Sequence, residues 1–385
     1  MTLPFDIDNP TLALAAWSRI CEPGDPDAHR LVKAAGPSAA LRWLLEPAAR
    51  AASSGAGVRQ ALRRWLPRLE GLDPRRELRV LHSLGGCLIA PGEPSWPVGL
   101  DDLGEAAPLC LWQWSPTGLN LAEWCQQSVA VVGSRACTHY GTTVAGTMVR
   151  QLVSAGLTVV SGGAFGIDAA AHRATLAAGG RTVAVMAGGL DRLYPAANED
   201  MLRQVAATGA VISELPPGSA PRRERFLDRN RLMAAMTKAT VVVESGWRSG
   251  AHRTAAVAAE LLRPVAAVPG PVTAASSAGC HRLIREGAAT LVTGADQVLE
   301  LATNLGRTPE TLTECQPGPL DGLSGPERRV FDALPLRGIA PVSQVVVASG
   351  LATAQVLGAL SRLEQAGRAA TTGGGWRRNL PTNSR

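Results

Sequence analysis

Four short segments of the chain combine glycine and serine, or a run of arginines, in ways suited to holding phosphate groups. The first, Gly133-Ser134-Arg135, comes directly after the apolar stretch 128–132 and precedes a long helical pattern. A small-residue turn between a strand and a helix presents free backbone N–H groups and is a natural anion site. The other segments are 161–166, 222–231 and 245–250. Two of the four offer backbone N–H groups and two offer arginines, so we expect them to hold a row of phosphates.

Alternating strands and helices are predicted around these segments. Short apolar runs rich in β-branched residues are typical of buried parallel strands, and helical spacing separates most of them. This alternation predicts a Rossmann-like, doubly wound α/β fold, in which helices cover both faces of an open parallel sheet. Right-handed crossovers place the strand-to-helix loops on one rim, where such folds bind ligands. The predicted strands are 128–132, 157–161, 182–186, 211–214, 240–244, 265–268 and 289–292, and the predicted helices are 138–154, 168–178, 198–207, 229–238, 250–262 and 280–286.

Shifts in composition divide the chain into four parts. Residues 1–84 show helical bursts punctuated by proline and glycine, which predicts a small helical domain. We expect residues 85–303 to hold the sheet. The stretch 85–127, rich in proline, glycine and tryptophan, can hold short strands such as 109–112 but is expected to be an irregular lead-in. Residues 304–322 resemble a linker. Residues 323–385 predict three helices and a glycine-tipped hairpin, which together resemble a winged helix.

The composition is that of a folded protein with a modest positive charge. The 385 residues carry a formal net charge of +6, and 46% of them are hydrophobic. Lys33 and Lys238 are the only lysines, so arginine, whose planar fork suits phosphate, supplies nearly all the positive charge. The seven cysteines include no Cys-x-x-Cys pair, which predicts neither disulfides nor a metal site and indicates a reducing, cytoplasmic compartment. An uninterrupted apolar run of about 18 residues is absent, so we expect no membrane span.

Common nucleotide-binding and hydrolytic motifs do not fit these segments. The turn at 133–137 lacks the Gly-x-Gly-x-x-Gly fingerprint of dinucleotide sites, neither lysine lies in a Walker A loop, and no Gly-x-Ser-x-Gly elbow occurs at these loops. Asp168 and His172 lie four residues apart on a predicted helix and could perform acid–base chemistry. A helix-capping aspartate and a packed histidine fit the pattern better. We therefore predict no cofactor, no metal and no catalytic residue.

Several motifs, in this order, resemble the DNA-processing protein A family, DprA, also called Smf. The resemblance is strong from about residue 109 to residue 302. It implies the same Rossmann-like fold, a small N-terminal helical domain of the SAM or helix-hairpin-helix type, and an optional winged-helix domain. The matching motifs are VAVVGSR at 129–135, SGGAFGIDAAAH at 161–172, AVMAGGLDRLYPAAN at 184–198, ISELPPG at 212–218, FLDRNRLMAAM at 226–236, VVVESGWRSG at 241–250 and GCHRLIREGA at 279–288.

The resemblance implies a non-enzymatic homodimer that binds single-stranded DNA and helps load RecA onto it in natural transformation and recombination. The family's phosphate pocket corresponds here to Gly133, Ser134, Arg135, Ser161, Gly162, Gly163, Arg229, Asn230, Arg231, Ser249 and Gly250, with Arg223, Phe226 and Phe165 as further candidates. Phe226 could give a base a stacking face worth about 1–3 kcal/mol. Replacing Arg135, or both Arg229 and Arg231, by alanine should weaken single-strand binding and leave thermal stability nearly unchanged.

Departures from the family pattern leave other interpretations open. Phe165 stands where the family often has arginine, so an expected phosphate contact is replaced by a stacking or packing residue. Phosphoribohydrolases that cleave nucleoside monophosphates use the same sheet, and a phosphate pocket could serve such an enzyme. Their Pro-Gly-Gly-x-Gly-Thr segment corresponds here to 244–251, which reads ESGWRSGA. A transcription factor built on the tail is disfavoured, because Glu364 offsets Arg362 on its third helix.

Overall fold

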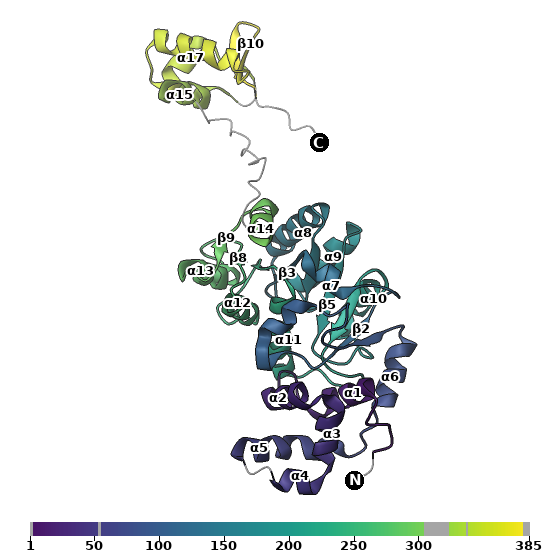
Figure 1. Ribbon diagram of the computed structural model, residues 1–385. Helices are drawn as coiled ribbons and strands as arrows, with labels where there is room; N and C mark the ends of the chain where they lie inside the picture. Colours follow the sequence, from purple (N-terminus) through teal and green to yellow (C-terminus); the bar gives the residue numbers. More distant parts are fainter. Residues whose placement is uncertain (1–2, 53–54, 304–322, 336–337, 380–385) are drawn as a thin grey trace. The chain divides into compact units, whose positions relative to one another are not determined.

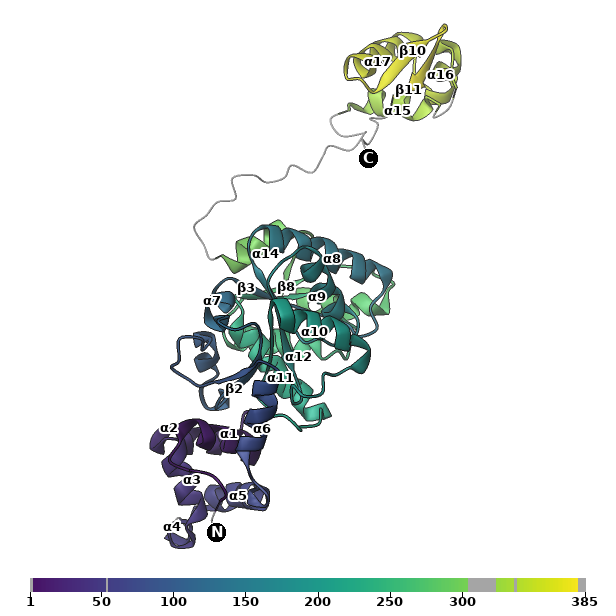
Figure 2. The same cartoon turned by 90° about the vertical axis from the view of Figure 1, so that its right-hand side faces the viewer.

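The computed structural model describes residues 3–52, 55–303, 323–335 and 338–379. The chain forms two compact units, residues 1–308 and residues 309–385, and each is described by itself. Figures 1 and 2 show a sheet with flanking helices in the first unit and a small bundle with a hairpin in the second. The predicted linker, 304–322, lies outside the described residues.

Nine strands form one sheet in the first unit: β1 (Cys87–Ile89), β2 (Leu111–Trp114), β3 (Ser128–Val132), β4 (Thr158–Ser161), β5 (Thr182–Met186), β6 (Ala210–Ser213), β7 (Ala239–Val242), β8 (Val265–Ala267) and β9 (Thr290–Leu291). Their order is β1-β2-β6-β5-β4-β3-β7-β8-β9. From β6 to β9 all neighbours are parallel, as predicted, whereas β2 pairs antiparallel with both β1 and β6. The lead-in 85–127 therefore holds the short strand expected near 109–112, as β2, and is more regular than predicted because β1 also extends the sheet.

Strand β3 shows why the apolar runs form strands. All its residues are buried, and alternate side chains point to opposite faces. Val129 and Val131 belong to one hydrophobic cluster, and Ala130 and Val132 belong to another. From β3 the chain passes through β4 and β5 to β6, and then returns to β7 on the other side of β3. This reversal makes a topological switch point between β3 and β7, where doubly wound folds leave a crevice for ligands.

Helices cover both faces of the sheet, which confirms the doubly wound architecture. The helices α8 (His139–Ser154), α9 (Ile167–Ala177) and α14 (Ala295–Ala302) pack on the face of Val129. The face of Ala130 is covered by η2 (Val98–Ala106), α7 (Leu121–Gln126), α11 (Arg223–Met236), α12 (Ala251–Glu260) and α13 (Ala278–Arg285). Farther along, α10 (Glu199–Thr208) packs on β5 and β6. The arginine-rich segment 222–231, predicted as a loop, is mostly helical, because α11 begins at Arg223 and not at residue 229.

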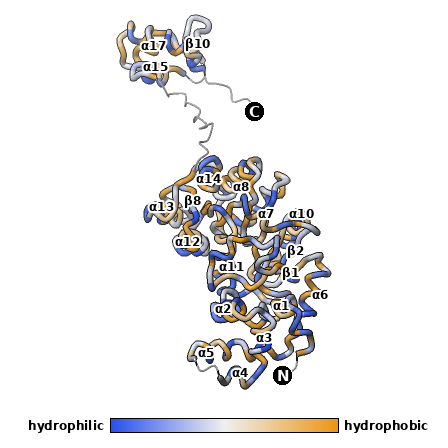
Figure 3. Tube along the Cα trace, in the orientation of Figure 1, coloured by the Kyte–Doolittle hydropathy of each residue, from blue (hydrophilic) through white to orange (hydrophobic). Residues whose placement is uncertain are grey.

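Six helices precede the sheet and lie together at one end of the first unit in both views: α1 (Pro10–Ile20), α2 (Pro26–Ala35), α3 (Pro37–Leu45), α4 (Pro47–Ala52), α5 (Ala56–Trp65) and α6 (Pro74–Ser83), with a short η1 (Leu66–Leu69). Proline at the first helical position, preceded by a capping Asn9, Asp25 or Asp73, starts α1, α2 and α6. Blue and orange alternate along these helices in Figure 3, as expected of helices that bury one side.

The second unit contains α15 (Gly325–Ala333), α16 (Val342–Ser349), α17 (Thr353–Gln365) and a hairpin of β10 (Ala369–Thr372) and β11 (Gly375–Arg378). Ser324 and Glu327 form a capping box at the start of α15. The three helices bury a core that includes Phe331 and Leu360. This arrangement confirms the predicted winged helix.

Two features of the described residues bear on localisation and metals. Within them, no single helix is long and apolar enough to cross a membrane, and α16 and α17 pass the length and composition test only as a pair bent by 106°. The same part of the chain shows no group of three or more His, Cys, Asp or Glu side chains arranged to hold a metal ion.

Candidate functional site

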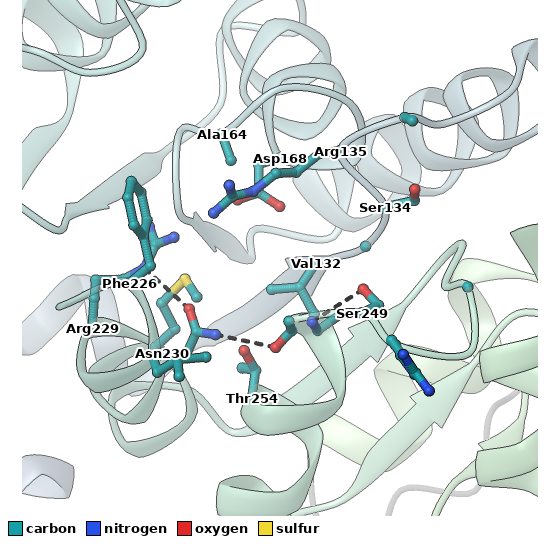
Figure 4. A pocket seen from close by; sticks show the side chains of 18 residues that line it. Val132, Ser134, Arg135, Ala164, Asp168, Phe226, Arg229, Asn230, Ser249 and Thr254 are labelled. Atoms are coloured by element: carbon teal, nitrogen blue, oxygen red, sulfur yellow. Dashed lines mark hydrogen bonds between the residues drawn. The ribbon is translucent and has the colours of Figure 1, made fainter. Parts of the chain in front are cut away.

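A pocket of about 460 Å³ opens at the switch point, between the turn after β3 and the loop after β7 (Figure 4). The start of α9 and the first half of α11 complete its walls. Three arginines and one aspartate are its charged groups, which gives it a net positive charge. The lining residues are Val132, Gly133, Ser134, Arg135, Ala136, Ala164, Asp168, Phe226, Leu227, Arg229, Asn230, Met233, Gly246, Arg248, Ser249, Gly250, Ala251 and Thr254.

The start of α8 already holds a carboxylate of the chain itself. Glu244, two residues after β7, is buried, and its carboxylate accepts hydrogen bonds from the backbone N–H and the hydroxyl of Thr138, both at 2.8 Å. Its backbone oxygen accepts the N–H of Ser134 at 2.6 Å. A carboxylate satisfies the same groups and helix dipole as a phosphate would. The N–H groups of Ser134 and Thr138 are therefore taken by Glu244, and the turn offers the pocket its side chains.

Asp168 occupies the second turn in a similar way. It is 6% exposed, and its carboxylate interacts with the backbone N–H groups of Gly162 and Ala164. The prediction that Asp168 caps α9 is wrong, because Gly166 is the N-cap residue and Asp168 lies inside the first turn. Burial raises the pKa of Asp168 above its ordinary value, against the opposing effects of Arg229 and the two amides.

Arg229 brings a buried positive charge to the pocket wall. It is 5% exposed, and its guanidinium donates to the backbone oxygen of Val185 and, at 3.2 Å, to Oδ1 of Asn230. The group lies so close to Gly162 that even a Cβ there would overlap it, which explains the glycine. Burial lowers the pKa of Arg229 to about 10, against the attraction of Asp168, so it stays protonated at neutral pH.

Arg135 and Phe226 form the accessible part of the pocket. The guanidinium carbon of Arg135 lies 4.8 Å from the centre of the Phe226 ring, and that ring lies 5.8 Å from the ring of Tyr194. Figure 4 shows the exposed Arg135 side chain lying beside that of Asp168. The pair thus combines a cation with free N–H donors and an aromatic face beside it.

The loop after β7 and the start of α12 form another wall. Asn230 donates from Nδ2 to the backbone oxygen of Gly250 at 3.1 Å, which ties α11 to the start of α12. Gly250 is the N-cap residue, and it supplies no side-chain cap. Thr254 is buried one turn further on, and its hydroxyl has no hydrogen-bond partner within the described part of the chain. The first amides of α12 already have partners, because Ala251 donates to the hydroxyl of Ser249 at 3.3 Å and His252 and Arg253 donate to the backbone oxygens of Ser249 and Gly250. The unpartnered hydroxyl of Thr254 is therefore the group of this wall that suits an oxygen-rich ligand.

Arg231 lies away from the pocket. Its Nη2 reaches both carboxylate oxygens of Glu214, at 2.7 and 2.6 Å, and Arg231 is only 7% exposed. Glu214 also accepts the backbone N–H of Gly24 at 3.2 Å, so the pair links α11 to the loop between α1 and α2. The burial of both Arg229 and Arg231 argues against the expectation that the two can be replaced together with stability nearly unchanged.

The pocket brings together eight of the fourteen residues predicted from the sequence. Gly133, Ser134, Arg135, Phe226, Arg229, Asn230, Ser249 and Gly250 line it, and Ser161, Gly162, Gly163, Phe165, Arg223 and Arg231 do not. Ser161 is buried, with its hydroxyl donating to Val131, and Arg223 is exposed at the start of α11. Sequence reasoning missed Arg248 and Thr254, although Arg248 lies inside a segment that it singled out.

Ser245 and His252 form a serine–histidine pair beside the pocket, but the direction of their hydrogen bonds does not suit nucleophilic catalysis. Arg282 donates to Nδ1 of His252 at 2.8 Å, so the neutral ring carries its proton on Nε2. That Nε2 lies 2.8 Å from the hydroxyl of Ser245, to which it must donate. Burial and Arg282 lower the pKa of His252, which keeps the ring neutral. A histidine that donates to serine cannot accept the serine proton, so this pair does not activate a nucleophile.

His172 is a packed histidine. It is fully buried, and its Nδ1 lies 2.8 Å from the hydroxyl of Thr182, which itself donates to the backbone oxygen of Val159. Nδ1 therefore donates to Thr182. Burial lowers the pKa of His172 to about 3, so the ring stays neutral in the folded protein at pH values where an exposed histidine is charged.

His172 should make the protein less stable in acid. The pKa of His172 is about 6.5 in the unfolded chain and about 3 in the folded protein. As the pH falls from about 6.5 to about 3, the unfolded chain binds a proton at this residue and the folded protein does not, so the free energy of unfolding decreases over that interval. At pH 4 this one group accounts for about 3 kcal/mol. The measurement is the free energy of denaturant unfolding at pH 7 and pH 4. The variant His172→Asn keeps a donor near the position of Nδ1 but has no group that titrates. Its free energy of unfolding should therefore decrease less between pH 7 and pH 4 than that of wild type, and an equal decrease would contradict the assignment.

The fold and the pocket define a doubly wound α/β protein with a positively charged pocket at its switch point and a winged-helix unit in the same chain. The chain belongs to the DNA recombination-mediator protein A family, whose family model matches residues 87–303. The model of the DprA winged helix domain matches residues 315–375.

Individual relatives agree with this assignment. A putative DNA processing protein DprA from Mycobacterium tuberculosis is 45% identical over 383 residues, covering 96% of this chain and 95% of the relative. The X-ray structure of DprA from Streptococcus pneumoniae superposes with a TM-score of 0.60 at 29% identity, covering 74% of this chain and 95% of that one. A structure of DprA from Helicobacter pylori, reported for its single-stranded DNA binding mode, has a TM-score of 0.50 at 25% identity and covers 56% of this chain and 94% of that one.

Proposed function

We propose that this protein binds single-stranded DNA through its phosphate backbone in the pocket at the switch point. The observation that carries the proposal is the charge of that pocket, which is lined by Arg135, Arg229 and Arg248 and by one buried carboxylate, Asp168. The phosphates lie among these arginines, beside the unpartnered hydroxyl of Thr254, because Glu244 and Asp168 already accept the backbone N–H groups of Thr138, Gly162 and Ala164. Guanidinium groups bind phosphate through paired, charge-assisted hydrogen bonds.

The aromatic side chains favour a single strand over a free phosphate compound. Phe226, with Tyr194 beside it, offers a ring face on which an unstacked base can lie, and such contacts are worth about 1–3 kcal/mol. Bases are free to stack on side chains only when they are not paired. The RecA-loading role follows the family resemblance: a bound strand held by its backbone leaves most base edges free. We propose that the protein is a non-enzymatic mediator that helps load RecA in recombination and natural transformation, in the cytoplasm and without a cofactor.

We also propose that the protein acts as a homodimer. Strand β9 is an edge of the sheet, and both of its residues are exposed. An exposed edge offers unpaired backbone groups, including those beside the apolar Leu291, to a second copy of the chain. Sedimentation equilibrium at micromolar concentration should give twice the mass of the chain, and a single-chain mass would contradict the proposal.

Salt titration of DNA binding tests the proposed function. Affinity for single-stranded DNA should fall steeply as the salt concentration rises: the slope of log affinity against log salt concentration should become steeper by about 0.7 for each phosphate contacted. The affinity for a single strand should also exceed that for duplex DNA of the same length. Addition of the same protein preparation should shorten the lag before RecA assembles on single-stranded DNA, compared with RecA alone. Equal affinity for both DNA forms and a shallow slope would overturn the proposal. Release of base from nucleoside monophosphates, followed by chromatography, would favour the phosphoribohydrolase alternative.

A further inference from the structure

A second groove of about 590 Å³ adjoins the pocket. The two share Arg135 and Ala136, so the groove begins where the pocket ends. It runs over α8 and α9, which pack against each other, and its other charged lining residues are Arg150 and Arg173. All three charged groups are therefore positive, and the lining contains no carboxylate.

The arginines of the groove are available to a ligand. Arg150 is exposed and donates only to Thr147 of its own helix, at 3.1 Å, and Arg173 is exposed and donates to Asn198 at 3.2 Å. Within the described residues neither has a carboxylate at ion-pair distance. By contrast, Arg203 on the neighbouring α10 is neutralised by Glu199 at 2.7 Å. Two unpaired arginines on adjacent helices, together with Arg135, make a line of positive charge.

The rest of the groove suits a flexible, phosphate-rich chain with apolar parts. Small residues, Gly146, Ala170 and Ala174, line it and leave room for a backbone to approach the helices. Phe165 also lines it, is 47% exposed and belongs to none of the core clusters, so its ring face is open to a ligand. Cations beside an exposed aromatic face are the two components of single-strand sites.

We propose that this groove binds a second stretch of the same DNA strand, which leaves the pocket at Arg135 and crosses α8 and α9. The proposal rests on the proposed function, because it extends that site. Arg135 is the point where the two stretches meet, Arg150 and Arg173 each hold a phosphate, and Phe165 gives a base a stacking face. A strand too short to reach past Arg135 does not use the groove.

Oligonucleotide length separates the two sites. The probes are oligothymidylates of about 4 and about 16 nucleotides, which span the site sizes of single-strand binding folds. With the long probe, the slope of log affinity against log salt concentration should be shallower by about 1.4 in the double variant Arg150→Ala with Arg173→Ala than in wild type, because each phosphate contact to a single strand contributes about 0.7. The short probe should bind both proteins equally. The matched control is Arg30→Ala with Arg75→Ala, which removes the same charge from exposed ion pairs on the N-terminal helices.

Two further measurements guard against a misfolded variant. Arg150→Ala alone, which touches only its own helix, should lose about half of that slope change, and circular dichroism should match wild type. Cys137 lines the groove and not the pocket, so its alkylation in a Cys87→Ser, Cys315→Ser background reports occupancy directly. The long probe should protect the Cys137 thiol, and the short probe should not.

The outcomes distinguish the groove from the pocket. If wild type binds the short probe and gains neither affinity nor salt slope with the long one, the groove proposal is overturned and the proposed function stands. The groove proposal is also contradicted if the salt slope for the long probe is the same in the double variant as in wild type, or if the double variant no longer binds the short probe. If wild type binds neither probe, both proposals fall together.

Discussion

Replacing Arg135 by alanine should lower the affinity for single-stranded DNA by about 10- to 100-fold. A hydrogen bond to a charged group contributes about 1.5–3 kcal/mol, and each 1.4 kcal/mol is a factor of ten. Arg135 is exposed and lies over the ring of Phe226, and Arg229 remains beside the buried Asp168 when Arg135 is removed. The free energy of unfolding should therefore change by less than about 0.5 kcal/mol.

Fluorescence anisotropy with a labelled oligothymidylate at fixed salt measures this effect. Arg135→Lys keeps the charge but not the planar fork, so its affinity should lie between those of wild type and Arg135→Ala. Arg75→Ala is the control, since Arg75 is an exposed arginine on α6 that pairs with Asp73 at 2.7 Å. If Arg135→Ala and Arg75→Ala bind alike, the pocket is not the DNA site.

The sheet and its rim could be predicted because their causes are local. A strand buried on both faces must be a continuous apolar run, and the run at 128–132 is β3 without a change of bounds. Parallel connection then places the loops after β3 and β7 side by side, which is how Arg135 and Ser249 come to line one pocket. Such inferences need only the residues of each segment and the handedness of the connections.

The hydrogen-bond partner of the N–H groups at the start of α8 could not be predicted, because it comes from a distant part of the chain. Glu244 satisfies Thr138, 106 residues earlier, and nothing in either segment marks the pairing. The start of α11 could not be placed from the sequence, which predicts the helix from residue 229, whereas α11 begins at Arg223. From the motif alone, Arg229 and Arg231 look equivalent. Two residues apart on a helix they point to different sides, one to the pocket and the other to Glu214.

Replacing Arg231 by alanine should lower the free energy of unfolding by about 3–5 kcal/mol, the usual cost of breaking a buried ion pair. The side chains of Arg231 and Glu214 are only 9% and 12% exposed, so alanine would leave an uncompensated carboxylate against Gly24. The loss should loosen the N-terminal helices first, since the pair links them to α11. Urea unfolding followed by circular dichroism measures the change.

A second variant separates a structural role from a DNA contact. Arg231→Met with Glu214→Leu removes both charges and keeps apolar bulk, so it should recover most of the lost stability. If Arg231 acts only through the ion pair, this double variant should bind single-stranded DNA as tightly as wild type. A stable double variant with affinity lowered as far as in Arg135→Ala would mean that Arg231 contacts a phosphate. Burial argues for the first result: Nη2 of Arg231 is held by both carboxylate oxygens of Glu214, and Nη1, which has no partner within the described residues, is buried away from a ligand.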